Sequence, residues 1–198
     1  MTVIVDLGCA NLASVGYALE RLGVPFKISR DASEISAADR IILPGVGSAS
    51  FSARQLDSRE LRAVLVKATQ PILGVCLGMQ LLYETSEEGD AICLGLLSGM
   101  VTRLEVSAVE TWPHMGWSRL RQTRNDSRLL SGIDDGAYAY FVHGFCCPID
   151  DATVGEAEYG ARFAAAVEKD NVFGCQFHPE RSSAMGAKIL KNFLEVPC

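Results

Sequence analysis

The chain has 198 residues, of which 48% are hydrophobic and 21% charged, and its net charge is −6. This length and composition predict one globular domain over residues 1–198, able to bury roughly 70% of the surface that the unfolded chain exposes. The negative charge argues against nucleic-acid binding, and no apolar run reaches the ~20 residues of a membrane span.

The seven cysteines are odd in number and form no CxxC pair, which argues against a structural zinc site and a complete disulfide framework. Free thiols indicate a reducing compartment, so we expect a cytoplasmic protein. No metal and no cofactor are expected. The N-terminus has no basic lead and no signal peptide is expected. We expect the adjacent Cys146 and Cys147 to be free, because a vicinal disulfide is strained.

The first half of the chain alternates strand-like and helix-like segments. Strands are predicted at 3–7, 26–29, 40–47 and 72–75, and helices at 12–23, 61–69 and 77–85. The first helix places Leu12, Val15 and Leu19 at helical spacing, with Asn11 as its N-cap. This alternation predicts an α/β fold with a doubly wound, mostly parallel sheet flanked by helices.

The second half has shorter predicted strands. They lie at 101–104, 137–142, 154–159, 163–168 and 172–177, and a final helix covers about 184–194. Residues 168–171 have the composition of a hairpin turn, so extra antiparallel strands are expected here. Residues 105–135 are rich in polar and turn-forming residues and are expected to form a loop.

The segment GVCLG (74–78) sets Cys76 between Gly74 and Gly78, after an apolar strand. This is the pattern of a nucleophile elbow with cysteine in the place of serine. The bend would lift the thiol to the end of the sheet, where the N-terminus of the next helix favours a thiolate. The N–H of Leu77 would be free for an oxyanion. The alternative is that Cys76 is a buried core thiol and the glycines only permit close packing.

Two further segments carry candidate chemistry. In QFHPE (176–180), His178 and Glu180 are two residues apart, so on an extended backbone their side chains leave on one face and the carboxylate can orient the imidazole. In LPGVG (43–47), backbone N–H groups can hold an anion or a developing oxyanion. The alternatives are a solvated strand end and a plain β-turn. Together the three segments supply the groups for acyl transfer through a thioester.

PGVG, GVCLGMQLL and QFHPE together resemble the class I (triad) glutamine amidotransferases over residues 44–180. PHMGW (113–117), YFVHG (140–144) and HPERS (178–182) narrow the resemblance to the glutaminase subunits of imidazole glycerol phosphate synthases, in histidine biosynthesis. The resemblance implies a flavodoxin-like fold in which Cys76 attacks the glutamine amide. His178 would protonate the departing ammonia and then activate water, and Glu180 would orient His178.

The resemblance also implies roles for other residues. The oxyanion and glutamine would be held by Gly45, Val46, Gly47, Leu77, Gln80, His143, Gly144 and Phe145. The ammonia would pass to a (β/α)8-barrel cyclase that makes imidazole glycerol phosphate and an aminoimidazole carboxamide ribotide, and a ligand on that partner would make the oxyanion loop competent. The partner-facing residues would be Met115, Trp117, Ser118, Tyr140 and Arg181.

Several of these residues also have structural interpretations. Met115 and Trp117 can be packing residues, and His114 and His143 can be structural, because the triad already has its histidine. Arg181 can be a solvated surface charge. The sequence departs from the family pattern at Ser118, where asparagine is expected, and at Gly144 and Phe145, where Ser-Tyr is expected. GCAN at 8–11 likewise replaces Gly-x-Gly-Asn.

Three other functions are compatible with parts of the sequence. The chain could be the amidotransferase subunit of anthranilate or aminodeoxychorismate synthesis, against which PHMGW weighs. It could be a non-catalytic scaffolding subunit, against which the intact triad weighs. It could be a cysteine hydrolase or redox-sensing relative, which would not combine the HPE segment with the oxyanion loop.

Overall fold

A computed structural model describes residues 1–8 and 11–197. The first half contains strands β1 (Thr2–Val5), β2 (Phe26–Ser29), β3 (Arg40–Gly45) and β4 (Ile72–Cys76), and helices α1 (Leu12–Arg21), α2 (Ala32–Ser36), α3 (Ala49–Ser58), α4 (Leu61–Val66) and α5 (Leu77–Gln80). The second half contains β5 (Thr85–Ser86), β6 (Ala91–Ile92), β7 (Met100–Arg103), β8 (His114–Gln122), β9 (Ala137–His143), β10 (Phe145–Cys146), β11 (Thr153–Tyr159), β12 (Ala161–Lys169), β13 (Val172–Cys175), the 3₁₀ turn η1 (Pro179–Arg181) and α6 (Ser183–Glu195).

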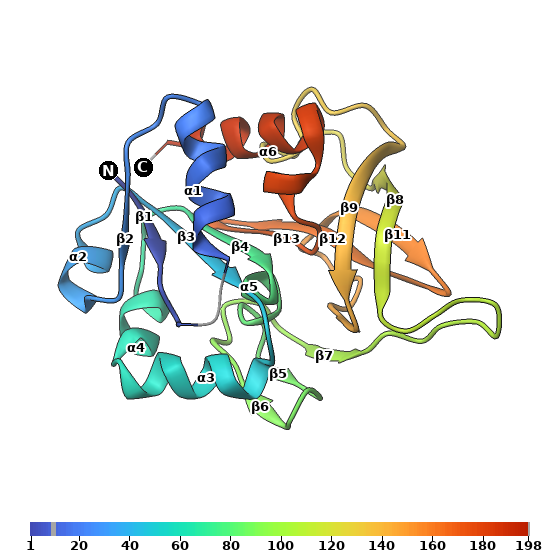
Figure 1. Cartoon of the computed structure of the whole chain (residues 1–198), viewed down its shortest axis with the longest axis horizontal. Helices are drawn as coiled ribbons and strands as arrows, with labels where there is room; N and C mark the ends of the chain where they lie inside the picture. The colour runs from blue at the N-terminus through green and yellow to red at the C-terminus, as the bar shows by residue number, and fades with distance from the viewer. Residues whose placement is uncertain (9–10, 198) are drawn as a thin grey trace.

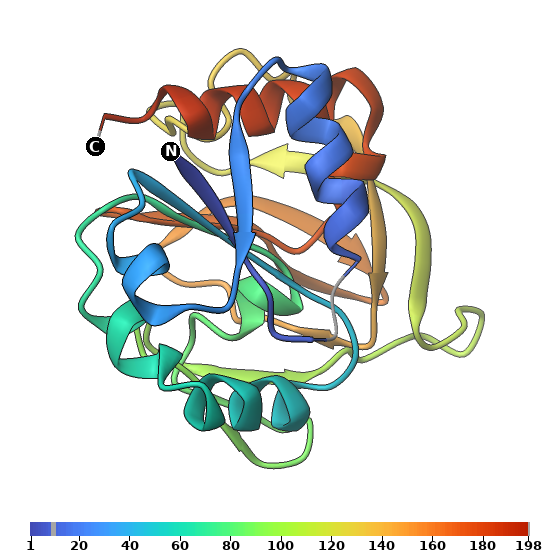
Figure 2. The ribbon, with the colours of Figure 1, turned by 60° about the vertical axis from the view of Figure 1, so that its left-hand side comes forward.

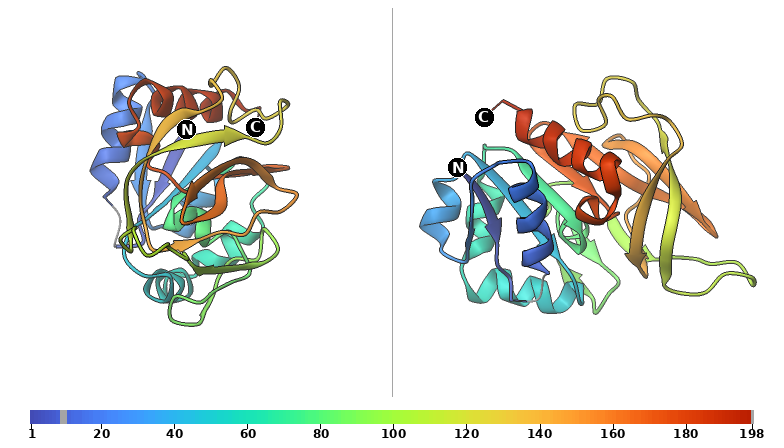
Figure 3. Two further views of the ribbon diagram at one scale, coloured as in Figure 1. Left: turned by 90° about the vertical axis from the view of Figure 1, so that its right-hand side faces the viewer. Right: turned by 45° about the horizontal axis from the view of Figure 1, so that its top comes forward.

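Nine strands form one twisted sheet in the order β2-β1-β3-β4-β13-β12-β11-β8-β9. Strands β2 through β13 in that order pair in parallel, and the strands from β13 onward pair antiparallel. Strands β2 and β9 therefore form the two edges of this sheet, and the views in Figures 1 and 3 show them well apart. This mixed α/β sheet confirms the predicted fold class.

Successive side chains of the central strands enter two different cores. Val3 and Val5 of β1 pack in the cluster that includes side chains of α2, α3 and α4, whereas Ile4 packs in the cluster with α1 and α6. Figure 2 shows α1 and α6 on one face of the sheet and α3 and α4 on the other. Burial on both faces explains why these strands are continuous apolar runs.

Two local predictions, the N-cap of α1 and the hairpin turn at 168–171, are confirmed. The Asn11 side chain caps α1 by accepting a hydrogen bond from the N–H of Ser14 at 3.3 Å. Asp170 and Asn171 join β12 to β13 as a two-residue turn, with Lys169 paired to Val172. Cys9, Ala10 and Cys198 lie outside the described residues, and with them most of the GCAN departure.

The helix predicted over 77–85 is wrong in length. Helix α5 ends at Gln80, and the chain continues through hydrogen-bonded turns that close at Leu82 and Tyr83. Every residue from 77 to 83 is buried, so this segment has no exposed face of the kind that a longer surface helix presents. The segment 40–47 is a strand that runs into a glycine loop, as predicted: β3 ends at Gly45, and Gly47 takes a positive φ of 95° that leaves the extended region.

The loop predicted over 105–135 contains the nine-residue strand β8, which is a second error. The strand pairs with β9 from His114 to Leu120, and with β11 at Arg121 and Gln122. Its inward positions include the polar His114 and Ser118, and its outward positions include the apolar Met115 and Trp117. From His114 to Ser118 the alternation is therefore inverted relative to an ordinary half-buried strand, so the local pattern did not indicate this strand.

Two short helices were also not indicated by the sequence, α2 and α3. Ser48 caps α3 by accepting a hydrogen bond from the N–H of Phe51 at 3.4 Å. This cap starts the helix directly after the glycine loop that follows β3. Within residues 1–8 and 11–197, no helix combines the length and the apolar character needed to cross a bilayer.

Candidate active site

Cys76 stands at a sharp bend between β4 and α5. It is the last residue of β4, pairs in register with Gly45 of β3, and has a φ of 54° and a ψ of −114°. A positive φ is uncommon for a residue with a side chain and persists only where the surrounding structure imposes it. The bend predicted from GVCLG is therefore present, and Cys76 itself adopts the strained conformation.

Three glycines allow α5 to lie directly against the sheet. A Cβ at Gly78 would lie 1.7 Å from the carbonyl oxygen of Leu43, and a Cβ at Gly74 would lie 2.7 Å from the backbone of Gly78. A Cβ at Gly45 would lie 2.8 Å from the Cβ of Leu77. Any side chain at these positions would push α5 away from β3 and β4, and with it the backbone next to the thiol.

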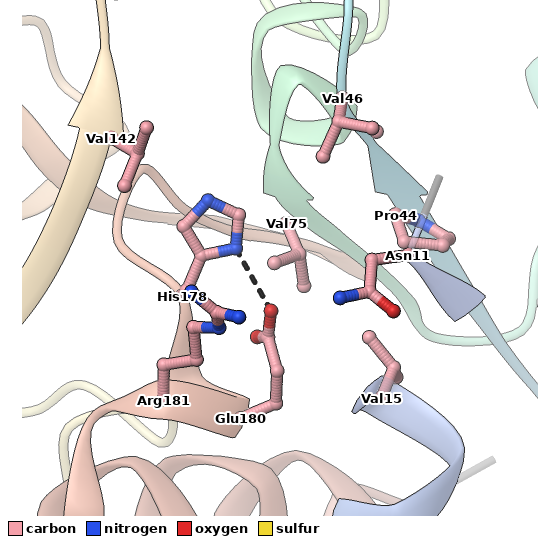
Figure 4. Close-up of a pocket in the computed structure, with 10 residues that line it drawn as sticks. Asn11, Val15, Pro44, Val46, Val75, Val142, His178, Glu180 and Arg181 are labelled. Atoms are coloured by element: carbon pink, nitrogen blue, oxygen red, sulfur yellow. Dashed lines mark hydrogen bonds and ion pairs between the residues drawn. The ribbon is translucent and has the colours of Figure 1, made fainter. Parts of the chain in front are cut away.

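His178 and Glu180 form a buried pair beside the elbow (Figure 4). The imidazole Nδ1 lies 2.8 Å from a carboxylate oxygen of Glu180, and the two side chains are 11% and 5% exposed. The backbone is extended only up to His178, because Pro179 starts the turn η1. The two side chains thus meet across a 3₁₀ turn, and not along a strand as expected.

Strand β9 holds this segment in place. The N–H of His178 donates to the carbonyl of Tyr140 at 2.9 Å. The hydroxyl of Ser182 donates to the carbonyl of His178 at 2.7 Å and accepts from the N–H of Tyr140 at 3.0 Å. The backbone of His178 is therefore fixed to β9, the edge strand of the sheet.

Opposing effects set the charge of His178. Burial lowers its pKa, but Cys76 and Glu180 outweigh burial and raise the pKa to about 10. The second carboxylate oxygen of Glu180 is buried and has no hydrogen-bond partner among the described residues. At neutral pH this environment favours a protonated imidazole between a sulfur and a carboxylate.

The thiol of Cys76 is 6% exposed and has two polar neighbours besides His178. It donates to the carbonyl oxygen of Val142 at 3.6 Å, and the side-chain amide of Gln176 donates to the sulfur at 3.8 Å. Four other described cysteines, Cys93, Cys146, Cys147 and Cys175, are free and buried, and burial raises their pKa values. They differ from Cys76 in having no histidine partner, which makes them inert core thiols.

The residues predicted for the oxyanion surround the elbow. Gly45 pairs with Cys76, Leu77 follows it, and Val46 and Gly47 continue from β3 into the loop before α3. Val46 is 37% exposed and lines a cavity with Gly45. The backbone of this loop thus lies at the same edge of the sheet as the thiol.

The residues predicted for glutamine binding form a buried hydrogen-bond network. The carbonyl of Phe145 accepts from the Gln80 amide at 2.8 Å and from His143 Nδ1 at 2.8 Å. Both Gln80 and His143 are at most 5% exposed. The side-chain nitrogen of Gln80 also donates to Gln176 at 3.0 Å, so both of its N–H bonds are committed within the protein.

A histidine pair extends this network to β8. His143 Nε2 lies 3.3 Å from His114 Nδ1, and His114 Nε2 lies 3.0 Å from the hydroxyl of Ser118. Burial lowers the pKa of His114 to about 4 and that of His143 to about 3, so both are neutral. Because the Phe145 carbonyl only accepts, each step has one direction: Ser118 donates to His114, His114 to His143, and His143 to the carbonyl.

The predicted partner residues do not all lie on one face. Met115 and Trp117 are 65% and 50% exposed on the outer face of β8, and the Trp117 ring lies 5.6 Å from that of Tyr140 on β9. Ser118 points inward, to His114. Arg181 is exposed and lines the cavity beside His178 (Figure 4).

A cavity opens on the imidazole from the side of Glu180. It is lined by Asn11, Val15, Pro44, Gly45, Val46, Val75, Val142, His178, Glu180 and Arg181 (Figure 4). Gln80 and residues 143–145 lie outside it. Sequence reasoning missed Val142 and Gln176 as neighbours of the thiol, although Gln176 lies inside the QFHPE motif. Within the part of the chain that the structure describes, no group of three or more His, Cys, Asp or Glu side chains is arranged to hold a metal ion.

Comparisons with known proteins agree with this geometry. The model of the family "Glutamine amidotransferase class-I" matches residues 3–196. The chain is 49% identical over 195 residues to "Imidazole glycerol phosphate synthase subunit HisH" of Yersinia pseudotuberculosis, covering 98% of both chains. It is 50% identical over 194 residues to the subunit of the same name from Idiomarina loihiensis, covering 98% of this chain and 97% of that protein.

Solved structures share the fold at lower identity. A "glutamine amidotransferase" crystal structure has a TM-score of 0.74 at 19% identity, covering 98% of this chain and 97% of that one. PurLQS from Thermotoga maritima has a TM-score of 0.69 at 24% identity, covering 98% and 96%. The chain therefore belongs to the class I glutamine amidotransferases and, within them, to the HisH subunits of imidazole glycerol phosphate synthase.

Proposed function

We propose that this chain hydrolyses glutamine to glutamate and ammonia through a thioester on Cys76. The observation that carries the proposal is the strained elbow cysteine next to the buried His178–Glu180 pair. A nucleophile, a proton carrier and a group that orients it are the three parts required for covalent acyl transfer.

The steps follow from the positions of these groups. The thiolate of Cys76 attacks the side-chain carbonyl of glutamine, and the N–H groups of Leu77 and of the Val46–Gly47 segment hold the oxyanion. The imidazolium of His178 gives its proton to the nitrogen, and ammonia leaves as the thioester forms. His178, now neutral, takes a proton from water, the hydroxide attacks the thioester, and glutamate leaves with the thiolate restored. Glu180 keeps Nδ1 of His178 protonated throughout.

We further propose that the ammonia goes to a (β/α)8-barrel cyclase subunit, which makes imidazole glycerol phosphate and an aminoimidazole carboxamide ribotide. The names of the related proteins support a multi-subunit enzyme. The outer face of β8 and β9 is our candidate docking surface for this partner, because Met115, Trp117 and Tyr140 lie there. This face is continuous with the active site, because Val142 of β9 lines the cavity beside His178. The free buried thiols support a cytoplasmic location.

The test measures glutamate release from glutamine by this chain, alone and with the cyclase barrel carrying its ribonucleotide ligand. We expect strong release in the loaded mixture, and a loss of at least 1,000-fold in Cys76→Ser and His178→Gln. Cys93→Ser, which alters a buried thiol after β6, is the control and should retain activity. Glutamate release retained in Cys76→Ser would refute the thioester. Glutamate release that requires a chorismate-binding partner would refute the assignment to histidine biosynthesis and favour chorismate amination.

A further inference from the structure

The side-chain amide of Gln176 lies between Gln80 and the sulfur of Cys76. Gln176 follows β13 directly, precedes His178 by two residues, and is fully buried. Its oxygen accepts from the amide nitrogen of Gln80 at 3.0 Å, and its nitrogen donates to the sulfur at 3.8 Å. None of the proposed steps of glutamine hydrolysis uses this amide.

The direction of these hydrogen bonds is fixed by a backbone carbonyl. A carbonyl oxygen can only accept, so the group of Gln80 that lies 2.8 Å from the Phe145 carbonyl must be its nitrogen. The same nitrogen faces Gln176, which must therefore present its oxygen. The other end of the Gln176 amide, its N–H group, is left facing the sulfur of Cys76.

The Phe145 carbonyl is itself held in place independently of Gln80. It accepts a second hydrogen bond from His143 Nδ1 at 2.8 Å. Phe145 also belongs to β10, where it pairs with Arg103 of β7. Rotating the two glutamine amides would thus set oxygen against oxygen at a buried site, which costs far more than at a solvated one.

We propose that the Gln176 amide N–H stabilises the Cys76 thiolate, and that Gln80 is the positioning residue that keeps this N–H turned toward the sulfur. The proposal rests on the role of Cys76 as nucleophile. A hydrogen bond to an anion is stronger than one to a neutral group, so this donor favours the thiolate over the thiol. The Val142 carbonyl, which accepts from the thiol, acts in the opposite direction.

Other ionisable groups also act on this sulfur. His178 faces it from the segment after β13 and forms a cation–anion pair with Glu180. The buried thiols of Cys175 on β13 and of Cys147 after β10 interact with it as well. Substitutions at Gln176 leave all four groups in place, so the change they cause reports the amide alone.

The experiment measures the rate of Cys76 alkylation by iodoacetamide against pH, followed by mass spectrometry on the full chain. In Gln176→Glu a carboxylate would face the sulfur, and we expect the pH midpoint of alkylation to rise by at least one unit, with a roughly tenfold slower reaction at pH 7. Gln176→Met removes the donor without adding charge and should raise the midpoint by a smaller amount. Gln80→Met, which frees the amide to rotate, should also raise it.

Gln70→Glu is the matched control. Gln70 lies in the turn before β4, and its side-chain amide donates to the backbone carbonyls of Ile35 and Ser36. The substitution is therefore chemically the same but remote from the elbow. The midpoint should not move in this variant. An unchanged midpoint in folded Gln176→Met and Gln176→Glu would overturn the proposal. A shifted midpoint in a chain that releases no glutamate with any partner would refute the proposed function and leave this inference standing.

Discussion

The indole ring of Trp112 lies directly against the α-carbon of Gly144. A Cβ at position 144 would lie 2.4 Å from the Trp112 ring, and the indole N–H donates to the Gly144 carbonyl at 2.8 Å. The guanidinium of Arg103 lies 4.2 Å from the centre of the Trp112 ring, next to the same strand end. The close packing thus requires a glycine at position 144, because of a tryptophan 32 residues earlier in the chain.

This contact predicts that positions 112 and 144 are energetically coupled. Gly144→Ala should lower the free energy of unfolding by about 1–3 kcal/mol, since the methyl group overpacks the site. Trp112→Ala should cost about 1–2 kcal/mol through the lost hydrogen bond and ring contacts. In the double variant the methyl group has room, so the combined loss should be smaller than the sum. Urea unfolding of all four proteins measures this, and strictly additive losses would contradict the contact.

The packing of α5 predicts that Gly78 cannot carry any side chain. In Gly78→Ala the new methyl group would meet the Leu43 carbonyl, so we expect a loss of several kcal/mol in stability together with loss of glutaminase activity. Gly23→Ala provides the control, because Gly23 has a φ of 70° and open space around it. It should cost only about 1–2 kcal/mol, the ordinary cost of a left-handed conformation. A Gly78→Ala variant as stable as Gly23→Ala would show that α5 can move away from β3.

The neutral histidine pair predicts a loss of stability in acid. Burial lowers the pKa of His114 to about 4 and of His143 to about 3, both below the ordinary value of 6.5. In the unfolded chain these two histidines become protonated near pH 6.5, whereas in the folded chain they become protonated only near pH 3 to 4. The free energy of unfolding should fall as pH drops through this window, by up to about 1.4 kcal/mol per pH unit for each histidine.

His143→Gln isolates this effect from the acidic residues. The variant loses one titrating group, so its stability should fall less steeply between pH 6.5 and 4 than that of the wild-type chain, whatever its absolute stability. Thermal unfolding at several pH values gives the two slopes. Parallel curves for the two proteins would mean that His143 is protonated in the folded state.

The outer face of β8 predicts which residues bind the partner. Trp117→Ala should weaken binding of the cyclase barrel by about 10- to 100-fold, since a half-exposed tryptophan is typical of a binding hot spot. Ser118→Ala should have a smaller effect on affinity, because its hydroxyl points inward to His114. Ile92→Ala, an exposed apolar side chain on β6, is the control. Calorimetric titration distinguishes these variants, and normal affinity in Trp117→Ala would move the docking surface elsewhere.

The sequence by itself was sufficient for the features that depend on local patterns. The βαβ alternation predicted the parallel half of the sheet, the glycines around Cys76 predicted the elbow, and Asn11 predicted the cap of α1. These features follow from backbone sterics, hydrophobic period and capping, which act over a few residues. That residues 1–198 form a single domain stays a prediction, as do the catalytic roles.

Only the tertiary structure decided the features that depend on residues far apart in the chain. Strand β8 carries polar residues inward because His114 is satisfied by His143 on the neighbouring strand, and no local pattern contains that partner. Likewise Gly144 depends on Trp112, and the amide of Gln176 depends on Gln80 and on the carbonyl of Phe145. A buried polar group is stable only when its hydrogen bonds are made, and which residue makes them is determined by packing.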